Sequence, residues 1–240
     1  MDAKQVVFSY IDQHRDDIVA LLKQMVAYPT VNDGESEGNE LPMQEFFAEQ
    51  MRHARFDSVV MKAYDAEGKR PNVVATRKGR GGGRSLAFNG HSDVVPISYP
   101  ERWEFPPFSP EVKDGKLYGR GTSDMKGGLA AAFYALKALA DCDIALKGDV
   151  VLHSSVGEES QSAETIGAER AVKELYHTDF AIVCEPSNLE VQIASSALVF
   201  FNLIVQGKGV HVSAVNQMRF PQPGGLLSGN DIAVDAFRKS

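Results

Sequence analysis

Short apolar runs alternate with helix-like segments along most of this chain, and that alternation limits the folds it can adopt. Runs rich in β-branched residues between turn signals are typical of short strands. The expected strands are DSVVMKA (57–63), NVVATRKG (72–79), SLAFNG (85–90), DVVLHSSV (149–156) and DFAIVC (179–184). Strands that alternate with helices predict an α/β sheet covered on both faces.

The segments between these runs have apolar residues at helical spacing. Residues 4–27 predict one long amphipathic helix, which ends at Tyr28-Pro29. Further helices are expected at LPMQEFFAEQMRHA (41–54), LAAAFYALKALA (129–140) and AERAVKELY (168–176). The glycine-rich stretch GRGGGR (79–84) is interpreted as a flexible hairpin turn between two strands.

The pattern changes after residue 192. A longer strand is expected at ALVFFNLIVQGKG (197–209), and a short helix at NDIAVDAFRKS (230–240). One strand and one helix cannot bury their own apolar faces, so residues 193–240 are interpreted as the opening of a truncated second domain. The first domain is expected to span residues 1–192.

Charge and composition exclude several functions. The formal net charge is −7 and no stripe of Lys and Arg occurs, which argues against a nucleic-acid partner. No apolar run approaches the roughly 20 residues needed to cross a bilayer, and the N-terminus has no secretory pattern. The two cysteines, Cys142 and Cys184, are expected to be reduced, in a cytoplasmic protein with no membrane partner.

Acidic residues follow four of the apolar runs at their ends. His91 and Asp93 follow SLAFNG, Asp124 follows GKLYGRG, Glu158 and Glu159 follow DVVLHSSVG, and Glu185 follows DFAIVC. In an open α/β sheet, ligands bind beyond the carboxyl ends of the strands. One imidazole and five carboxylates at a single edge would repel one another strongly, and a bound metal would compensate that charge. The sequence therefore favours a metal site.

Each motif also has a plainer interpretation when taken alone. The pair His91 and Asp93 is compatible with a turn, although extended geometry would let Asp93 accept the second ring N–H of His91. Asp124 precedes a helix, where aspartate commonly serves as an N-cap. Glu158 and Glu159 are compatible with a solvated turn. The four remaining histidines considered, His14, His53, His153 and His177, are interpreted as structural or surface residues because no second ligand lies at metal spacing.

Four motifs carry a resemblance to a known family. NGHSDVVP, GRGTSDMKGGLAAA, GEES and CEPS resemble the zinc-dependent family of acetylornithine deacetylase, succinyl-diaminopimelate desuccinylase, aminoacylase and related carboxypeptidases and dipeptidases. The likeness extends from the first helix to about residue 240. It implies a mixed, mostly parallel sheet of the zinc-exopeptidase type, followed by the start of an α+β lid and dimerisation domain.

The resemblance also implies roles for individual residues. His91, Asp124 and Glu185 would hold one Zn²⁺, and Asp124 would bridge to a second Zn²⁺ that Glu159 also binds. Co²⁺ or Mn²⁺ are alternatives. Asp93 would orient His91, Glu158 would be the general base and acid, and the bond Asp124-Met125 would be cis. His211, in GKGVHVSA, would reach the active site of a partner subunit in a homodimer.

The expected reaction is hydrolysis of an N-acyl bond in a small acylated amino acid by metal-activated water. A dipeptidase or carboxypeptidase of the same family is the alternative that keeps the fold. A truncated, non-catalytic metal-binding or dimerising fragment is the alternative of another class. Family members continue beyond this length and supply a further histidine to the second metal, which these 240 residues do not contain.

Overall fold

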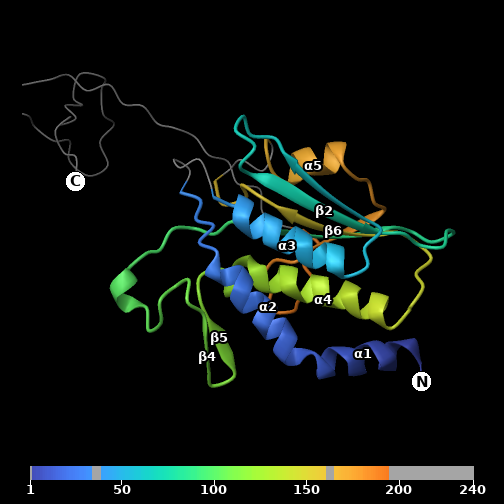
Figure 1. Cartoon of the computed structure of the whole chain (residues 1–240), viewed down its shortest axis with the longest axis horizontal. Helices are drawn as coiled ribbons and strands as arrows, with labels where there is room; N and C mark the ends of the chain where they lie inside the picture. Colours follow the sequence, from blue (N-terminus) through green and yellow to red (C-terminus); the bar gives the residue numbers. More distant parts are fainter. Residues whose placement is uncertain (1, 34–38, 161–164, 195–240) are drawn as a thin grey trace, which may run out of the picture. The chain divides into compact units, whose positions relative to one another are not determined.

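The structure is a computed structural model, and it describes residues 2–33, 39–160 and 165–194. Met1–Val191 form one compact unit around a five-stranded sheet (Figure 1). The expected strand 197–209, the helix 230–240 and His211 lie outside the described residues. The domain boundary after residue 192 therefore stays a prediction.

The central sheet has the strand order β1-β2-β6-β3-β7. Strand β2 is antiparallel to both neighbours, whereas β6, β3 and β7 are parallel to one another. Four strands therefore point one way and one points the other, which confirms a mixed, mostly parallel sheet. The strands lie close to the predicted runs: β1 (Ser58–Ala63), β2 (Pro71–Arg77), β3 (Leu86–His91), β6 (Val150–Ser155) and β7 (Phe180–Val183).

The edge strand β7 is far more exposed than the central strand β6. All six residues of β6 are buried, whereas all four residues of the edge strand β7 are exposed. Phe180, Ile182 and Val183 are each about half exposed, at 50%, 48% and 58%. Within the described residues, β7 pairs with β3 alone.

Helices cover both faces of the sheet, as the sequence predicted (Figure 1). On one face lie α2 (Arg15–Ala27), α3 (Leu41–His53) and α4 (Gly127–Asp141), and on the other lies α5 (Ala168–Glu174). Strand side chains alternate between the faces. Val73 and Ala75 of β2 join the core under the three helices, while Val74 joins a smaller cluster with Leu175 and Tyr176. Most of the apolar burial is therefore on the three-helix face.

The long helix expected over residues 4–27 is two helices, α1 (Ala3–Gln13) and α2. His14 between them has φ −110° and ψ 22°, outside helical values. Asp16 and Asp17 follow in the first turn of α2, where acidic side chains stabilise a helix N-terminus. The apolar spacing continues across the break, so periodicity alone does not reveal it.

The glycine-rich stretch 79–84 is not a hairpin turn, because β6 lies between β2 and β3 in the sheet. Instead it runs beside residues 146–148, and the N–H groups of Arg80 and Gly81 donate to the carbonyls of Leu146 and Lys147. A Cβ at Gly79 would lie 2.5 Å from the backbone of Gly148. Gly79 and Gly83 therefore permit close backbone packing, while Gly81 and Gly82 have positive φ values of 95° and 78°.

The run GKLYGRG does not join the central sheet. Within the part of the chain that the structure describes, its β5 (Lys116–Tyr118) pairs only with β4 (Glu111–Lys113) in a separate two-stranded sheet. A short 3₁₀ helix, Pro100–Arg102, precedes that sheet. An irregular turn, Thr122–Lys126, then leads into α4. Asp124 therefore lies in a turn before a helix and not at the end of a strand of the main sheet. The prediction that all the acidic residues follow strands of one sheet is wrong for Asp124.

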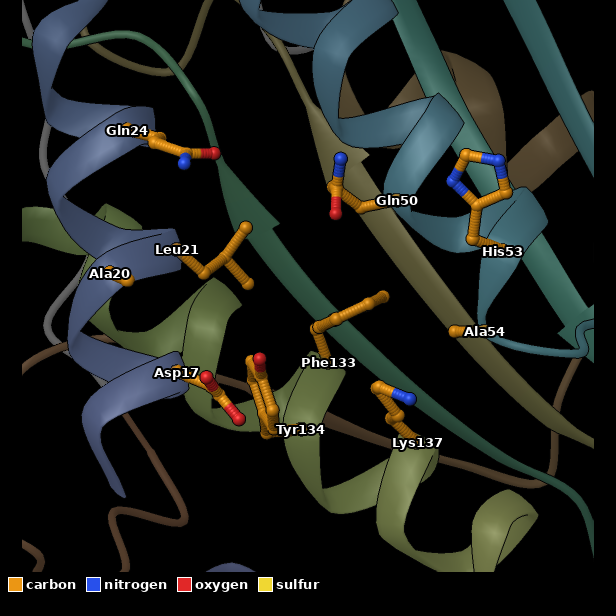
Figure 2. Close-up of a pocket in the computed structure, with 10 residues that line it drawn as sticks. All are labelled: Asp17, Ala20, Leu21, Gln24, Gln50, His53, Ala54, Phe133, Tyr134 and Lys137. Atoms are coloured by element: carbon orange, nitrogen blue, oxygen red, sulfur yellow. The ribbon is translucent and has the colours of Figure 1, made fainter. Parts of the chain in front are cut away.

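A cavity of about 210 Å³ lies among α2, α3 and α4 (Figure 2). Its lining mixes polar and apolar side chains, and none of the acidic strand-end residues contributes to it: Asp17, Ala20, Leu21, Gln24, Gln50, His53, Ala54, Phe133, Tyr134 and Lys137. Both cysteines are free and half-buried. No helix within the described ranges has the length and apolar character to span a membrane.

Candidate metal centre

Three adjacent parallel strands bring their carboxyl ends to one edge of the sheet. His91 ends β3 and lies opposite Ser155, the last residue of β6. The chain leaves β6 through Gly157, whose φ of 74° suits glycine, and reaches Glu158 and Glu159. After β7 comes Glu185. The sheet topology alone therefore gathers one histidine and three glutamates.

Asp124 reaches the same edge from the turn before α4. Its carboxylate Oδ1 lies 3.1 Å from Nε2 of His91. The bond Asp124-Met125 is cis, as the resemblance implied. A Cβ at Gly128 would lie 2.1 Å from the carbonyl oxygen of Cys184, so glycine is needed where α4 begins against the end of β7.

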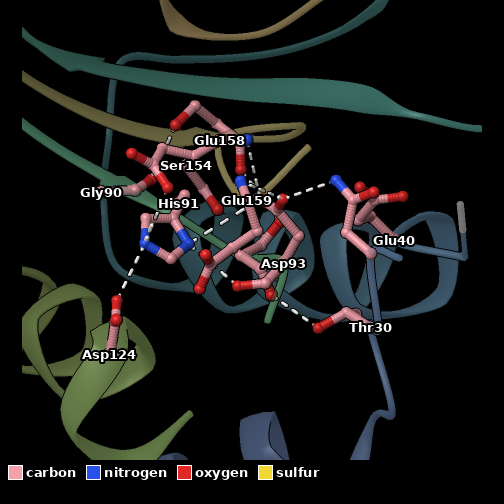
Figure 3. A network of polar contacts seen from close by, with 12 residues as sticks. Thr30, Glu40, Gly90, His91, Asp93, Asp124, Ser154, Glu158 and Glu159 are labelled. Carbon is pink, nitrogen blue, oxygen red and sulfur yellow. Dashed lines mark hydrogen bonds and ion pairs between the residues drawn. The ribbon is translucent and has the colours of Figure 1, made fainter. Parts of the chain in front are cut away.

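The predicted ligands converge around Nε2 of His91 (Figure 3). Ligand atoms of His91, Asp124 and Glu159 all lie within 4.8 Å of one another. Glu185 Oε1 is 3.5 Å from Nε2, and Glu158 Oε2 is 3.8 Å from it. Five residues that the sequence analysis singled out therefore lie close together in the fold, although they come from four separate segments: His91, Asp124, Glu158, Glu159 and Glu185.

Asp93 contacts the site in a way that differs from the prediction. His91 Nδ1 lies 2.9 Å from the backbone carbonyl oxygen of Asp93, whereas the nearer carboxylate oxygen is 3.8 Å away. Either contact can fix the imidazole with Nε2 toward the carboxylates. The carboxylate accepts the backbone N–H groups of Glu159 at 3.0 Å and Glu158 at 3.4 Å. Asp93 therefore orients the histidine with its carbonyl and the glutamate turn with its side chain.

The electrostatics of the cluster favour positive charge at its centre. Burial raises the pKa of Glu159 to about 7, and nearby carboxylates add to the shift. Burial also raises the pKa of Glu158; the charge of His91 opposes that shift and Glu185 adds to it. Burial lowers the pKa of His91, but the hydrogen bond to Glu185 and the charge of Asp93 outweigh it and raise that pKa to about 9.

The donor set fits a divalent cation. Among the described residues, no Lys or Arg forms an ion pair with Asp124, Glu158, Glu159 or Glu185, so His91 is the basic side chain that faces these carboxylates. One imidazole nitrogen and several carboxylate oxygens suit Zn²⁺ and also Mn²⁺ or Co²⁺. The side chains of Asp124 and Glu158 are 56% and 52% exposed, which leaves the cluster open to a small molecule.

Two buried residues near the site were not found by sequence reasoning. Asn32, 2% exposed, donates its amide N–H to Asp93 Oδ2 at 2.9 Å. Lys126 is fully buried and donates to the carbonyl oxygens of Met25 and Tyr28. Lys126 stands in the motif GRGTSDMKGG, where Met125 is its one apolar neighbour and no local pattern signals burial. Asn32 stands three residues after Pro29 in a polar loop, and nothing in its local sequence marks it.

His153 is not a ligand, in agreement with its interpretation as a structural residue. It is fully buried in β6, and burial lowers its pKa to about 3. Its Nε2 lies 3.2 Å from Asn72 Oδ1, and its Nδ1 lies 3.0 Å from both Asn89 Nδ2 and Tyr176 Oη. Neutral polar groups occupy both nitrogens, so neither is free to bind a metal.

Comparisons with known proteins agree with this geometry. Residues 87–237 match the family model described as peptidase family M20/M25/M40. The chain is 35% identical over 184 residues to N-formyl-4-amino-5-aminomethyl-2-methylpyrimidine deformylase of Bacillus subtilis, covering 76% of this chain and 41% of that protein. It is 34% identical over 199 residues to a probable succinyl-diaminopimelate desuccinylase of Staphylococcus epidermidis, covering 82% and 46%. It therefore spans less than half of these relatives.

Among solved structures, human carnosine dipeptidase 1 matches with a TM-score of 0.62 at 24% identity. The match covers 75% of this chain and 40% of that one. A metallo-carboxypeptidase of Sulfolobus solfataricus, described as an M20 family member, matches with a TM-score of 0.56 at the same identity. At this identity the likeness shows a shared fold, and it confirms the zinc-exopeptidase type of sheet.

Proposed function

We propose that this chain, which belongs to peptidase family M20/M25/M40, carries the metal centre and general base of a hydrolase that removes an acyl group from an amine nitrogen. The proposed substrate is a small N-acylated compound such as an acylated amino acid. Two relatives support this class, because a deformylase and a desuccinylase both release an acyl group. The observation that carries the proposal is the convergence of His91, Asp124 and Glu159 from separate segments.

His91, Asp124 and Glu185 are the proposed ligands of one Zn²⁺, and Asp124 with Glu159 are those of a second. When bound, such ions lower the pKa of a coordinated water toward neutrality and polarise a carbonyl oxygen. Asp124 suits a bridging position because its carboxylate lies 3.1 Å from Nε2 of His91 and within 4.8 Å of a ligand atom of Glu159. His211 of a partner subunit and the homodimer remain predictions from the resemblance.

Glu158 is the proposed general base and acid. Its backbone N–H points to Asp93, and its carboxylate lies near Nε2 of His91 but farther away than those of Asp124 and Glu185. Burial raises its pKa, so the carboxyl group can accept and return a proton nearer to neutral pH. It would take the proton of the attacking water and deliver it to the leaving amine. Its neighbour Glu159 would be left to hold metal.

The substitution Glu158→Gln tests this assignment. Zinc content should stay at the wild-type level, while kcat should fall by about 100-fold or more, since the amide cannot accept the proton. Glu49→Gln, at an exposed position on α3, is the control and should leave both unchanged. Wild-type turnover in Glu158→Gln would remove Glu158 from the role, and loss of zinc would instead make it a ligand.

A substrate panel separates the proposed activity from its alternatives. Formylated amines, succinyl and acetyl amino acids, and dipeptides should be compared by kcat/KM. We expect an N-acyl compound to have the highest kcat/KM of the panel. A dipeptide in first place would favour the dipeptidase or carboxypeptidase alternative. Zinc binding without turnover on any member would favour a non-catalytic metal-binding fragment.

A further inference from the structure

The segment that follows α2 lies directly behind the proposed metal centre. Thr30 Oγ1 donates to the carbonyl oxygen of Ser92 at 2.6 Å. The backbone N–H of Val94 donates to Thr30 at 2.9 Å, and that of Asn32 donates to Val94 at 2.8 Å. Thr30 and Asn32 are only 1% and 2% exposed. This short parallel pairing fixes the segment against residues 92–94.

Asn32 controls how the buried carboxylate of Asp93 is turned. Its Nδ2 donates to Asp93 Oδ2 at 2.9 Å, and the same oxygen accepts the N–H of Glu159 at 3.0 Å. Oδ1 faces the N–H of Glu158. The amide of Asn32 is thus a further donor to the buried carboxylate that accepts both glutamate N–H groups, and it stabilises the orientation in which Asp93 does so. Through Asp93, Asn32 therefore fixes the turn that carries Glu158 and Glu159.

Lys126 joins the same segment to the opposite side of the site. Its Nζ donates to the carbonyl oxygens of Met25 at 3.0 Å and Tyr28 at 2.8 Å, where α2 ends. The last carbonyls of a helix have few helical partners, and two of those near the end of α2 accept N–H groups of Lys126. Lys126 stands two residues after Asp124, in the irregular turn. The end of α2 therefore also holds the turn that presents Asp124.

We propose that residues 25–32 form a positioning segment for the metal centre, with Asn32 and Lys126 as positioning residues. The segment holds the Asp124 turn through Lys126 and the Glu158–Glu159 turn through Asn32 and Asp93. It thereby sets the separation of ligands that come from distant parts of the chain. This inference rests on the proposed function, since it assigns the segment to the same metal centre.

The test is the zinc affinity of the purified protein, measured by competition with a chromophoric chelator. Asn32→Ala should weaken zinc binding by about 10-fold or more, as loss of a group that orients metal ligands typically does. The matched control is Asn72→Ala. Asn72 is also fully buried and donates to a carbonyl, but it belongs to the His153 cluster. The Asn72→Ala variant should lose thermal stability and keep the zinc affinity of the wild type.

Two further variants keep the test decisive. Asn32→Ser is a milder change that also removes the amide donor, and it carries the same expectation if Asn32→Ala does not fold. Lys126→Met keeps the alkyl chain and removes the charge, and it should also weaken zinc binding. Wild-type zinc affinity in the folded Asn32 variant overturns the positioning role. A wild-type protein that takes up no zinc overturns the proposed function as well, so the two failures are distinguishable.

Discussion

Two buried histidines on neighbouring strands have opposite surroundings. His91 ends β3 and is 2% exposed, while His153 lies in β6 and is fully buried. The strands pair in parallel, with His153 opposite Asn89, two residues before His91. Carboxylates surround His91, and the amides of Asn72 and Asn89 with a tyrosine hydroxyl surround His153.

The difference shows that burial alone does not decide what a histidine does. Around His91, carboxylates outweigh burial and raise the pKa to about 9. Around His153, the partners among the described residues are neutral, so burial lowers the pKa to about 3. One histidine accepts positive charge, from a proton or a metal ion, and the other stays neutral. Three predictions would break or sharpen this contrast.

The largest expected effect is on metal binding. His91→Ala should reduce zinc affinity by at least about 100-fold, because it removes a proposed direct ligand rather than an orienting group. His153→Gln should bind zinc as the wild type does. Equilibrium dialysis with metal analysis measures both. A shared loss of zinc in the two variants would contradict the separation of the clusters.

A smaller effect concerns acid stability. The pKa of His153 is about 3 in the fold and about 6.5 when unfolded, so the unfolded chain binds more protons between these values. The contribution of neutral His153 to the free energy of unfolding is therefore complete above pH 6.5 and is lost as the pH falls. Between pH 7 and pH 5 the loss is about 2 kcal/mol. The pH dependence that His91 contributes has the opposite sign. Because its pKa is raised to about 9, His91 stabilises the folded state fully below pH 6.5, and this stabilisation is lost as the pH rises toward 9.

Urea unfolding of the wild type and His153→Gln at both pH values isolates this contribution. His91 acts equally in the two proteins, so the difference between their pH dependences belongs to His153. The variant should lose less stability on acidification than the wild type. Parallel pH profiles would mean that His153 is protonated in the folded state.

The smallest expected effect comes from Tyr176→Phe. The change removes the hydroxyl beside His153 Nδ1, while Asn89 still occupies that nitrogen. The free energy of unfolding should fall by about 1 kcal/mol, the usual size of one such hydrogen bond. Zinc affinity should not change. A loss of several kcal/mol in urea titrations would show that the hydroxyl, and not Asn89, is the main partner of His153.

Much of the fold and the candidate site could be predicted because the signals are local. Strand-end position placed His91, Glu159 and Glu185 together, since the carboxyl ends of parallel strands meet at one edge. The resemblance supplied the separate roles of Glu158 and Glu159, which no spacing rule distinguishes.

The features that sequence reasoning missed depend on packing between distant segments. Strand β6 enters between β2 and β3, so the glycine-rich stretch 79–84 could not be interpreted from its neighbours in sequence. The break at His14 leaves the apolar spacing intact. The contact of Asn32 with Asp93 joins residues 61 positions apart, and neither residue carries a local sign of it.

The exposed edge strand β7 has a practical consequence for handling the protein. Among the described residues β7 pairs with β3 alone, and a backbone edge flanked by apolar side chains is a template on which a strand of another molecule can add. We therefore expect intermolecular sheet growth at Phe180–Val183 wherever this edge is accessible. Lysine in place of Ile182 is the substitution that opposes such growth, because charge on an edge strand disfavours further pairing.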